Sequence, residues 1–178
     1  AVALGGDRFT SDIAIGLRTP IPEAEKTKRR SGCALTALVG EEETVDVASV
    51  GGREPRVMSK RTLSDCIQPL AENIFHALWD EINKAGYEKT LNSGIVLTGG
   101  GCMLDGIPEI AEQIFDSPVR RGHPVGLGRL HDHVNTPAFA TSVGLVMYAC
   151  RHQVVKRNRS PLWGWVTGVL ASLFKESS

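Results

Sequence analysis

Residues 94–107 read GIVLTGGGCMLDGI, in which an apolar run is followed by three consecutive glycines, Gly99, Gly100 and Gly101. The apolar run predicts a strand that is buried on both faces, which is typical of a parallel sheet. Residues 107–115 read IPEIAEQIF and predict a helix with a proline in its first turn. A strand, a glycine turn and a helix in this order predict an α/β fold.

The three glycines have two interpretations, a tight turn or a place where the backbone approaches a ligand. The dinucleotide fingerprint GxGxxG would need a glycine at position 104, which is Leu104. No GK[ST] follows the glycines, so the phosphate-binding P-loop is excluded as well.

The flanking segments predict further helices and strands. Residues 7–17 and 23–30 predict short helices, and residues 40–59 predict two antiparallel strands. Residues 59–87 carry an apolar stripe at three- and four-residue steps, which predicts a long helix that Pro69 kinks or divides. A strand near residue 119 and a helix at 135–152 follow.

The composition argues against several classes of function. The 178 residues hold 20 basic and 20 acidic side chains, so the net charge of zero gives no electrostatic case for a nucleic-acid partner. The four cysteines form no CxxC pair, so neither a zinc site nor a disulfide framework is indicated. Cys102, in the glycine turn, is expected to be a small buried side chain rather than a nucleophile.

The helix at 23–30 is strongly charged, and its helical spacing places Glu25 on the same face as Lys28. One interpretation is a solvated helix surface, and the other is one side of a ligand pocket.

The string LTGGGCMLDGIPEIAEQIF (97–115) resembles the adenosine motif of the actin-like ATPases. Three further segments resemble the FtsA family of bacterial cell-division proteins, and they occur in the expected order between residue 1 and about residue 150. They are GGDRFTSDIAIGLRTPIPEAEKTKRRSGCAL (5–35), SVGGREPRVMSKRTLSDCIQP (49–69) and VNTPAFATSVGLVMYA (134–149).

The resemblance implies an α/β fold: an actin-like (ribonuclease H-like) ATPase half with an inserted α+β subdomain and a C-terminal amphipathic helix. Residues 1–32 and 93–150 would form actin-like subdomain 2A, and residues 33–92 would form the inserted subdomain 2B. A basic flexible linker at 151–160 and an amphipathic membrane-targeting helix at 161–178 would complete the chain.

The resemblance also implies an ATP site, with Mg²⁺ in the full-length protein. Gly99, Gly100 and Gly101 would lie beneath the nucleoside, and Met103 and Leu104 would border the adenine and ribose. Glu25 and Lys28 match the family's E-x-x-K helix, in which the lysine lies against the adenine and ribose and the glutamate accepts from a ribose hydroxyl. The phosphate loops and magnesium-holding acids of the superfamily precede the point where this sequence begins, so we expect no catalytic residue, no metal ligand and no strong ATPase activity in this chain.

The C-terminal sequence predicts a membrane contact. Residues 151–160 carry four basic side chains and no acidic one, and an apolar stretch follows that is shorter than the roughly 20 residues needed to span a bilayer. The alternatives are a terminal helix that docks on the domain and an interfacial helix that binds anionic lipid. The membrane-binding side chains would be Leu162, Trp163, Trp165, Val166, Val169, Leu170, Leu173 and Phe174.

The resemblance implies that subdomain 2B binds the short, partly acidic C-terminal tail of the tubulin-like division protein FtsZ. Arg53, Arg56, Lys60 and Arg61 form a basic cluster that would match this tail, or they are ordinary surface charges.

The resemblance favours a cell-division adaptor that anchors the FtsZ ring to the cytoplasmic face of the inner membrane at the septum. It would self-associate into filaments and recruit other division proteins. The alternatives are another actin-fold adaptor, such as a pilus-assembly or MreB-like protein, and an actin-fold sugar kinase.

Overall fold

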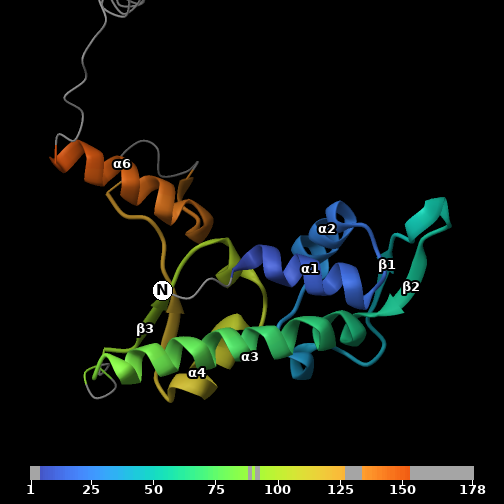
Figure 1. Ribbon diagram of the computed structural model, residues 1–178, viewed down its shortest axis with the longest axis horizontal. Helices are drawn as coiled ribbons and strands as arrows, with labels where there is room; N and C mark the ends of the chain where they lie inside the picture. Colours follow the sequence, from blue (N-terminus) through green and yellow to red (C-terminus); the bar gives the residue numbers. More distant parts are fainter. Residues whose placement is uncertain (1–4, 88–89, 91–92, 127–133, 153–178) are drawn as a thin grey trace, which may run out of the picture. The chain divides into compact units, whose positions relative to one another are not determined.

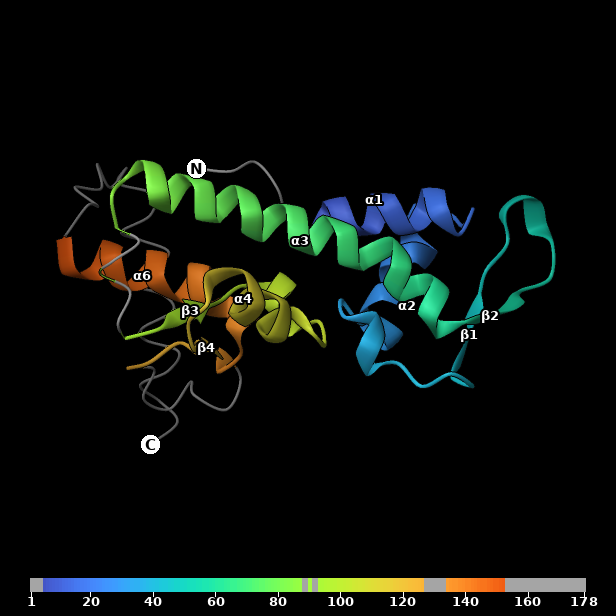
Figure 2. The same cartoon turned by 90° about the horizontal axis from the view of Figure 1, so that it is seen from below.

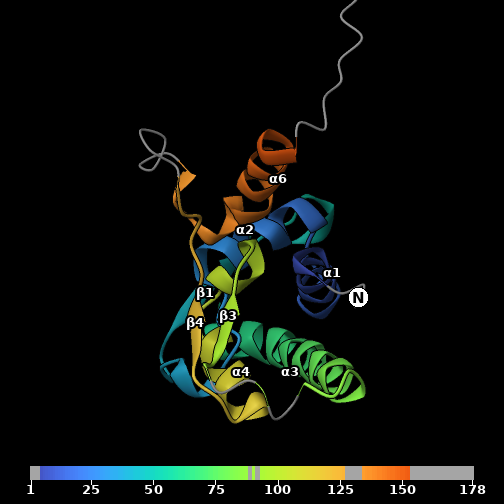
Figure 3. The ribbon, with the colours of Figure 1, turned by 90° about the vertical axis from the view of Figure 1, so that its left-hand side faces the viewer.

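The glycine turn joins a short parallel sheet to a helix, as the sequence predicts. The expectation that the strand before the turn is buried on both faces is wrong, because Val96 is 50% exposed. In the computed structural model, strand β3 (Ile95–Leu97) pairs in parallel with β4 (Val119–Arg121), so that Ile95 lies opposite Val119 (Figure 3). Helix α4 (Ile107–Phe115) connects the two strands. The structure describes residues 5–87, 90, 93–126 and 134–152, which belong to two units, Ala1–Val143 and Gly144–Ser178.

Two short helices begin the first unit. Helix α1 (Gly6–Gly16) and helix α2 (Ile21–Ser31) pack against each other, and Pro22 lies in the first turn of α2. A proline is tolerated there because the first helical N–H groups have no partner within the helix. Both helices lie where the sequence predicts them.

A hairpin follows, in which β1 (Thr44–Val47) pairs antiparallel with β2 (Arg56–Ser59). Its inward-facing residues, Val45 and Val47, are buried and alternate with exposed ones. Short 3₁₀ turns, η1 (Thr36–Leu38) and η2 (Val50–Gly52), flank β1. The predicted antiparallel pair is confirmed.

Helix α3 (Lys60–Lys84) extends from the hairpin to the parallel sheet (Figures 1 and 2). Pro69 lies inside it without dividing it, so of the two expected effects, a kink or a division, the division is wrong. The buried residues Leu63, Ile67 and Leu70 on either side of Pro69 supply the packing that offsets its missing hydrogen bond. Gly86 has a φ of 73°, which is typical of the residue after a helix end.

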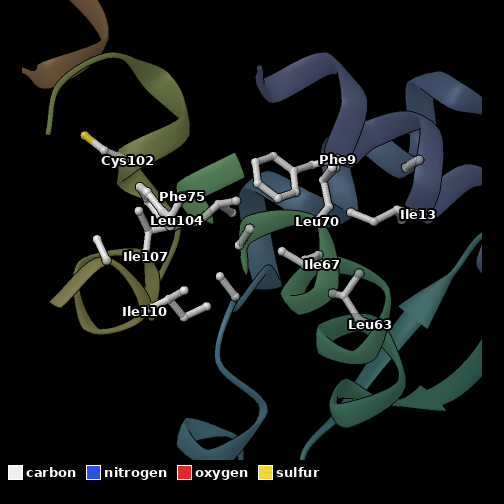
Figure 4. Packing of buried hydrophobic residues seen from close by; sticks show 14 of the residues in the cluster. Phe9, Ile13, Leu63, Ile67, Leu70, Phe75, Cys102, Leu104, Ile107 and Ile110 are labelled. Carbon is white, nitrogen blue, oxygen red and sulfur yellow. The ribbon is translucent and has the colours of Figure 1, made fainter. Parts of the chain in front are cut away.

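A single hydrophobic cluster unites these elements (Figure 4). Phe9 and Ile13 of α1, Ile67 and Phe75 of α3, and Ile110 of α4 are among its buried side chains. The cluster therefore includes side chains from both of the subdomains that the sequence predicts.

The chain continues through a 3₁₀ turn, η6 (Pro137–Phe139), into helix α6 (Ala140–His152). This helix includes residues 151 and 152, which the sequence assigns to the linker. No helix within the described ranges is long and apolar enough to cross a bilayer. The rest of the linker and the proposed membrane helix lie outside the described residues.

Candidate functional site

A pocket of about 810 Å³ lies between the glycine turn and helix α2. Helix α2 contributes one side of it, the 3₁₀ turn η4 (Gly100–Met103) contributes another, and Thr136, Ala138 and Phe139 contribute a third. Of the seven nucleotide-binding residues that the sequence predicts, the structure places six on this pocket and Gly99 immediately beside it: the six are Gly100, Gly101, Met103, Leu104, Glu25 and Lys28.

The same structural feature does not explain all three glycines of the turn. Gly99 has a φ of 94°, which favours glycine, and its N–H donates to the Pro137 carbonyl at 2.9 Å. Gly100 and Gly101 are not in the left-handed region, and a Cβ added to either would meet no atom within 4 Å. The fold of the described residues therefore requires a glycine at position 99 but not at positions 100 and 101.

The two apolar residues after the glycines lie in different environments. Met103 is 49% exposed at the pocket, whereas Leu104 is 8% exposed and belongs to the hydrophobic cluster. Gly106 is the N-cap of α4, with a φ of 80°, and makes no side-chain cap. A Cβ at Gly106 would lie 2.6 Å from the Leu35 nitrogen, so the backbone leaves no room for a side chain there.

Lys28 lies at the centre of a polar network between α1 and α2. Its Nζ lies 2.5 Å from Glu25 Oε2 and donates to Thr10 Oγ1 at 2.8 Å and to the Gly6 carbonyl at 3.0 Å. An ammonium group has three N–H donors, so these three acceptors use all of them. The side chain is only 10% exposed. The charged end of Lys28 is thus directed into the protein, and only its aliphatic stem can face a ligand.

Glu25 is held from two sides and keeps one oxygen free within the described part of the chain. Thr10 Oγ1 donates to Glu25 Oε2 at 2.5 Å, and the Lys28 ammonium contacts the same oxygen. Burial raises the pKa of this carboxyl, but the hydrogen bonds from Lys28 and Thr10 outweigh it, and the pKa lies below its usual value. With its side chain 40% exposed, Glu25 can present Oε1 to the pocket as an acceptor.

Two residues that hold the lining of this pocket in place were not predicted from the sequence. Thr10 lies 15 residues before Glu25, and only the packing of α1 on α2 brings the two together. Arg121 of β4 donates from Nε to the Cys102 carbonyl at 2.7 Å and from Nη2 to the Leu104 carbonyl at 3.0 Å. No local sequence pattern marks either residue.

Cys102 is a packing residue, as the sequence predicts. It is 5% exposed, and its Sγ lies 3.1 Å from the Gly99 carbonyl. Burial raises the pKa of its thiol, which opposes formation of a nucleophilic thiolate. Among the described residues no group of His, Cys, Asp and Glu has the arrangement of a metal site.

The four basic side chains of the predicted cluster differ in whether they already have a partner within the protein. Lys60 Nζ lies 2.9 Å from Glu43 Oε2, Arg61 lies 3.9 Å from Glu41, and Arg56 donates to the Leu17 carbonyl at the end of α1. The hydrogen bond to Glu43 raises the pKa of Lys60. Arg53 is exposed, and its side chain has no hydrogen bond or ion pair with any described residue. The predicted membrane-binding residues, 162–174, lie outside the described ranges.

Sequence comparison places most of this chain within one family. The model of the family described as "Cell division protein FtsA" matches residues 1–144. FtsA of Pseudomonas aeruginosa is 43% identical over 152 residues, which cover 85% of this chain and 36% of that protein. FtsA of Escherichia coli K12 is 35% identical over 188 aligned positions, covering 98% of this chain and 45% of that protein. The chain therefore spans less than half the length of these relatives.

Structural comparison points to the actin-like fold. MreB5 of Spiroplasma citri, solved with AMPPNP, has a TM-score of 0.64 at 15% identity, over 85% of this chain and 45% of that one. The same protein solved with ADP has a TM-score of 0.61 at 14% identity, over 83% of this chain and 44% of that one. At these identities the likeness shows the fold.

Proposed function

We propose that this chain, which belongs to the FtsA family of cell division proteins, forms the nucleoside-binding side of an ATP site. The whole protein would be an actin-like adaptor of bacterial division. The pocket between the glycine turn and α2 is the proposed site. The MreB5 structures with this fold carry ADP and AMPPNP, which supports a nucleotide as the ligand.

Gly100 and Gly101 are the observation that carries this proposal. Neither needs a positive φ, and neither would place a Cβ against a neighbouring atom. Glycine loses more conformational entropy on folding than alanine, so these two glycines lower stability. No backbone angle or close contact among the described residues requires them. A ligand that packs directly on the backbone of the turn would account for both of them.

The chemistry of the pocket fits a nucleoside better than a bare phosphate. Met103 offers an exposed thioether surface for a flat ring, and the stem of Lys28 offers a second apolar surface. Glu25 Oε1 is an acceptor that suits a ribose hydroxyl and repels a phosphate. The Mg²⁺-bound phosphates would be held by the part of the full-length relatives that this chain does not cover. We propose that any ATPase activity is weak.

A substitution pair tests the nucleotide site. In a protein of the relatives' full length that contains this chain, Gly101→Ala should fold normally and lose about tenfold or more in Mg-ATP affinity, because its methyl group occupies ligand space. Gly106→Ala should lower the free energy of unfolding, because its Cβ would meet Leu35. Calorimetric titration and urea unfolding separate the two effects, and unchanged ATP affinity in Gly101→Ala would refute the site.

The family places the whole protein in division, and we propose the adaptor role for it in full. The protein would lie at the cytoplasmic face of the inner membrane at the septum, bind the FtsZ tail, self-associate into filaments and help recruit other division proteins. The basic lead-in and the two tryptophans of the C-terminal sequence support a peripheral contact with anionic lipid.

The membrane proposal has its own test. A peptide of residues 160–178 should gain helical circular dichroism when anionic vesicles are added, and much less with zwitterionic ones, because both burial and charge contribute. Replacing Trp163 and Trp165 by Ser should weaken the response. An equal spectrum with and without anionic vesicles would refute a lipid-induced helix.

A further inference from the structure

We propose that Arg121 is a positioning residue that holds the glycine turn in the shape in which it receives the nucleoside. Arg121 does not line the pocket itself; it acts through the backbone of η4 and the residue that follows it. The expected effect of Arg121 on nucleotide affinity rests on the proposed function. Its effect on the shape of the turn can be measured without a nucleotide.

The turn is weakly held by its own hydrogen bonds. Cys102 N–H donates to the Gly99 carbonyl at 3.3 Å, and Leu104 N–H donates to the Gly101 carbonyl at 3.4 Å. Both distances exceed the usual range for N–H···O bonds. A four-residue 3₁₀ turn also leaves its last carbonyls without donors inside the turn.

Arg121 supplies further donors from the neighbouring strand; the Leu104 carbonyl also accepts a long bond from the Ile107 N–H, at 3.5 Å. The Nε and Nη2 of Arg121 reach the carbonyls of Cys102 and Leu104, one on either side of Met103, at 2.7 and 3.0 Å. A planar guanidinium presents several N–H groups in a fixed fork, so a single side chain can fix the separation of two carbonyls. The parallel pairing of β4 with β3 sets Arg121 opposite Leu97, just before the turn begins.

The clamped segment includes the exposed Met103, and Gly100 and Gly101 lie directly before it. When the guanidinium is removed, the two carbonyls lose charge-assisted hydrogen bonds, and the turn can sample other shapes. The pocket then has to be re-formed when the nucleotide binds, which lowers affinity without the loss of any direct ligand contact.

Strand β4 offers a matched control. Arg120 is the preceding residue and is exposed, and among the described residues it has no hydrogen bond or ion pair. Methionine keeps much of the apolar stem of arginine and removes the donors. Arg121→Met therefore removes the clamp, and Arg120→Met removes an exposed guanidinium from the same strand. Arg121→Lys keeps the charge, but its single ammonium lacks the planar fork.

The first measurement is amide hydrogen exchange of the chain without nucleotide. Arg121→Met should accelerate exchange at the Cys102 and Leu104 amides by about tenfold and leave the Ile67 amide of α3 unchanged, because a lost charge-assisted bond is worth roughly that factor. Arg120→Met should change neither. Arg121→Lys should lie between Arg121→Met and the unsubstituted chain.

The second measurement is Mg-ATP affinity in a protein of the relatives' full length. We expect a loss of about tenfold for Arg121→Met, a smaller loss for Arg121→Lys and none for Arg120→Met. Equal exchange at the turn in Arg121→Met and Arg120→Met would overturn the clamp, as would equal acceleration of the Ile67 amide. If the unsubstituted protein fails to bind ATP, the proposed function fails, and the exchange result still decides whether Arg121 holds the turn.

Discussion

The ammonium of Lys28 lies 2.5 Å from the carboxylate of Glu25, one helical turn before it on α2. The same ammonium also donates to Thr10 and to the Gly6 carbonyl of α1. Lys28 therefore joins the two helices and fixes the position of Glu25 at once. Because its three donors are already engaged within the protein, Lys28 would contact the proposed nucleotide only through its stem.

Replacing Lys28 by Met should destabilise the fold. The substitution keeps much of the stem but removes the ammonium that donates to the Thr10 hydroxyl, the Gly6 carbonyl and the Glu25 carboxylate. We expect a loss of about 1–3 kcal/mol in the free energy of unfolding, measured with urea. Lys26→Met is the matched control, because Lys26 pairs with Glu23 at 2.7 Å with its side chain 72% exposed. Its loss should stay below about 1 kcal/mol, and equal losses in the two variants would contradict an internal role for Lys28.

Glu25 should make stability depend on acid pH. Its pKa is lowered in the folded state from an ordinary value of 4.5, because hydrogen bonds from Lys28 and Thr10 outweigh the effect of burial. A group of this kind adds stability above its unfolded pKa, and that contribution disappears as the pH falls through the lower, folded pKa. The free energy of unfolding, measured between pH 7 and pH 2, should therefore fall less steeply with decreasing pH in Glu25→Gln than in the unsubstituted chain.

Salt separates this effect from that of a surface pair. Glu81 also has a lowered pKa, caused by its hydrogen bond with Lys84, but both side chains of that pair are exposed. We expect 0.5 M NaCl to remove most of the effect of Glu81→Gln and to leave much of that of Glu25→Gln. Screening acts mainly on exposed charges, and the Lys28 side chain is 10% exposed whereas that of Lys84 is 72% exposed. The same salt sensitivity in both variants would argue against the geometry of the Lys28 network.

The sequence predicts the local elements of this fold well, because their signals lie within a few residues. The apolar run at 95–97, the proline at the start of α2 and the antiparallel pair around Val45 each carry such a signal. The adenosine-type motif also brings Met103 to the pocket with the glycines. Pro69 is different, since whether it divides a helix depends on how firmly the flanking residues are packed, and packing is a property of the tertiary fold.

The parts of the site that escape prediction depend on distant contacts. Thr10 reaches Glu25 across a helix pair, and Arg121 reaches Cys102 from 19 residues away along the chain. The separate roles of Gly99 and Gly101 follow from backbone angles and free space, which three identical letters do not encode. The basic cluster around Arg56 looks uniform in sequence, yet its members have different partners in the structure.

Thr10 should influence how well the proposed site distinguishes ribose from deoxyribose. Its hydroxyl donates to Glu25 Oε2 and leaves Oε1 as the acceptor for a ribose hydroxyl. Thr10→Val removes this donor at nearly the same volume, and Thr10→Ser retains it. In a full-length protein we expect Thr10→Val to reduce the preference for ATP over 2′-deoxy-ATP several-fold, and Thr10→Ser to keep it. Calorimetric titration of both nucleotides measures the ratio, and an unchanged ratio in Thr10→Val would show that Thr10 does not position Glu25 for the ribose.

The proposed contact with the FtsZ tail should depend on Arg53 in a way that can be separated from folding. Arg53 is exposed and has no ion pair or hydrogen bond with a described residue, whereas Arg56 holds the Leu17 carbonyl at the end of α1. Arg53→Glu should therefore weaken binding of an acidic tail peptide by severalfold, leave urea unfolding nearly unchanged, and reduce the salt dependence of binding. Arg56→Glu should lower both binding and stability, because the Leu17 carbonyl loses its donor. Fluorescence anisotropy with a labelled peptide measures binding, and full binding by Arg53→Glu at low salt would show that this basic cluster is ordinary surface charge.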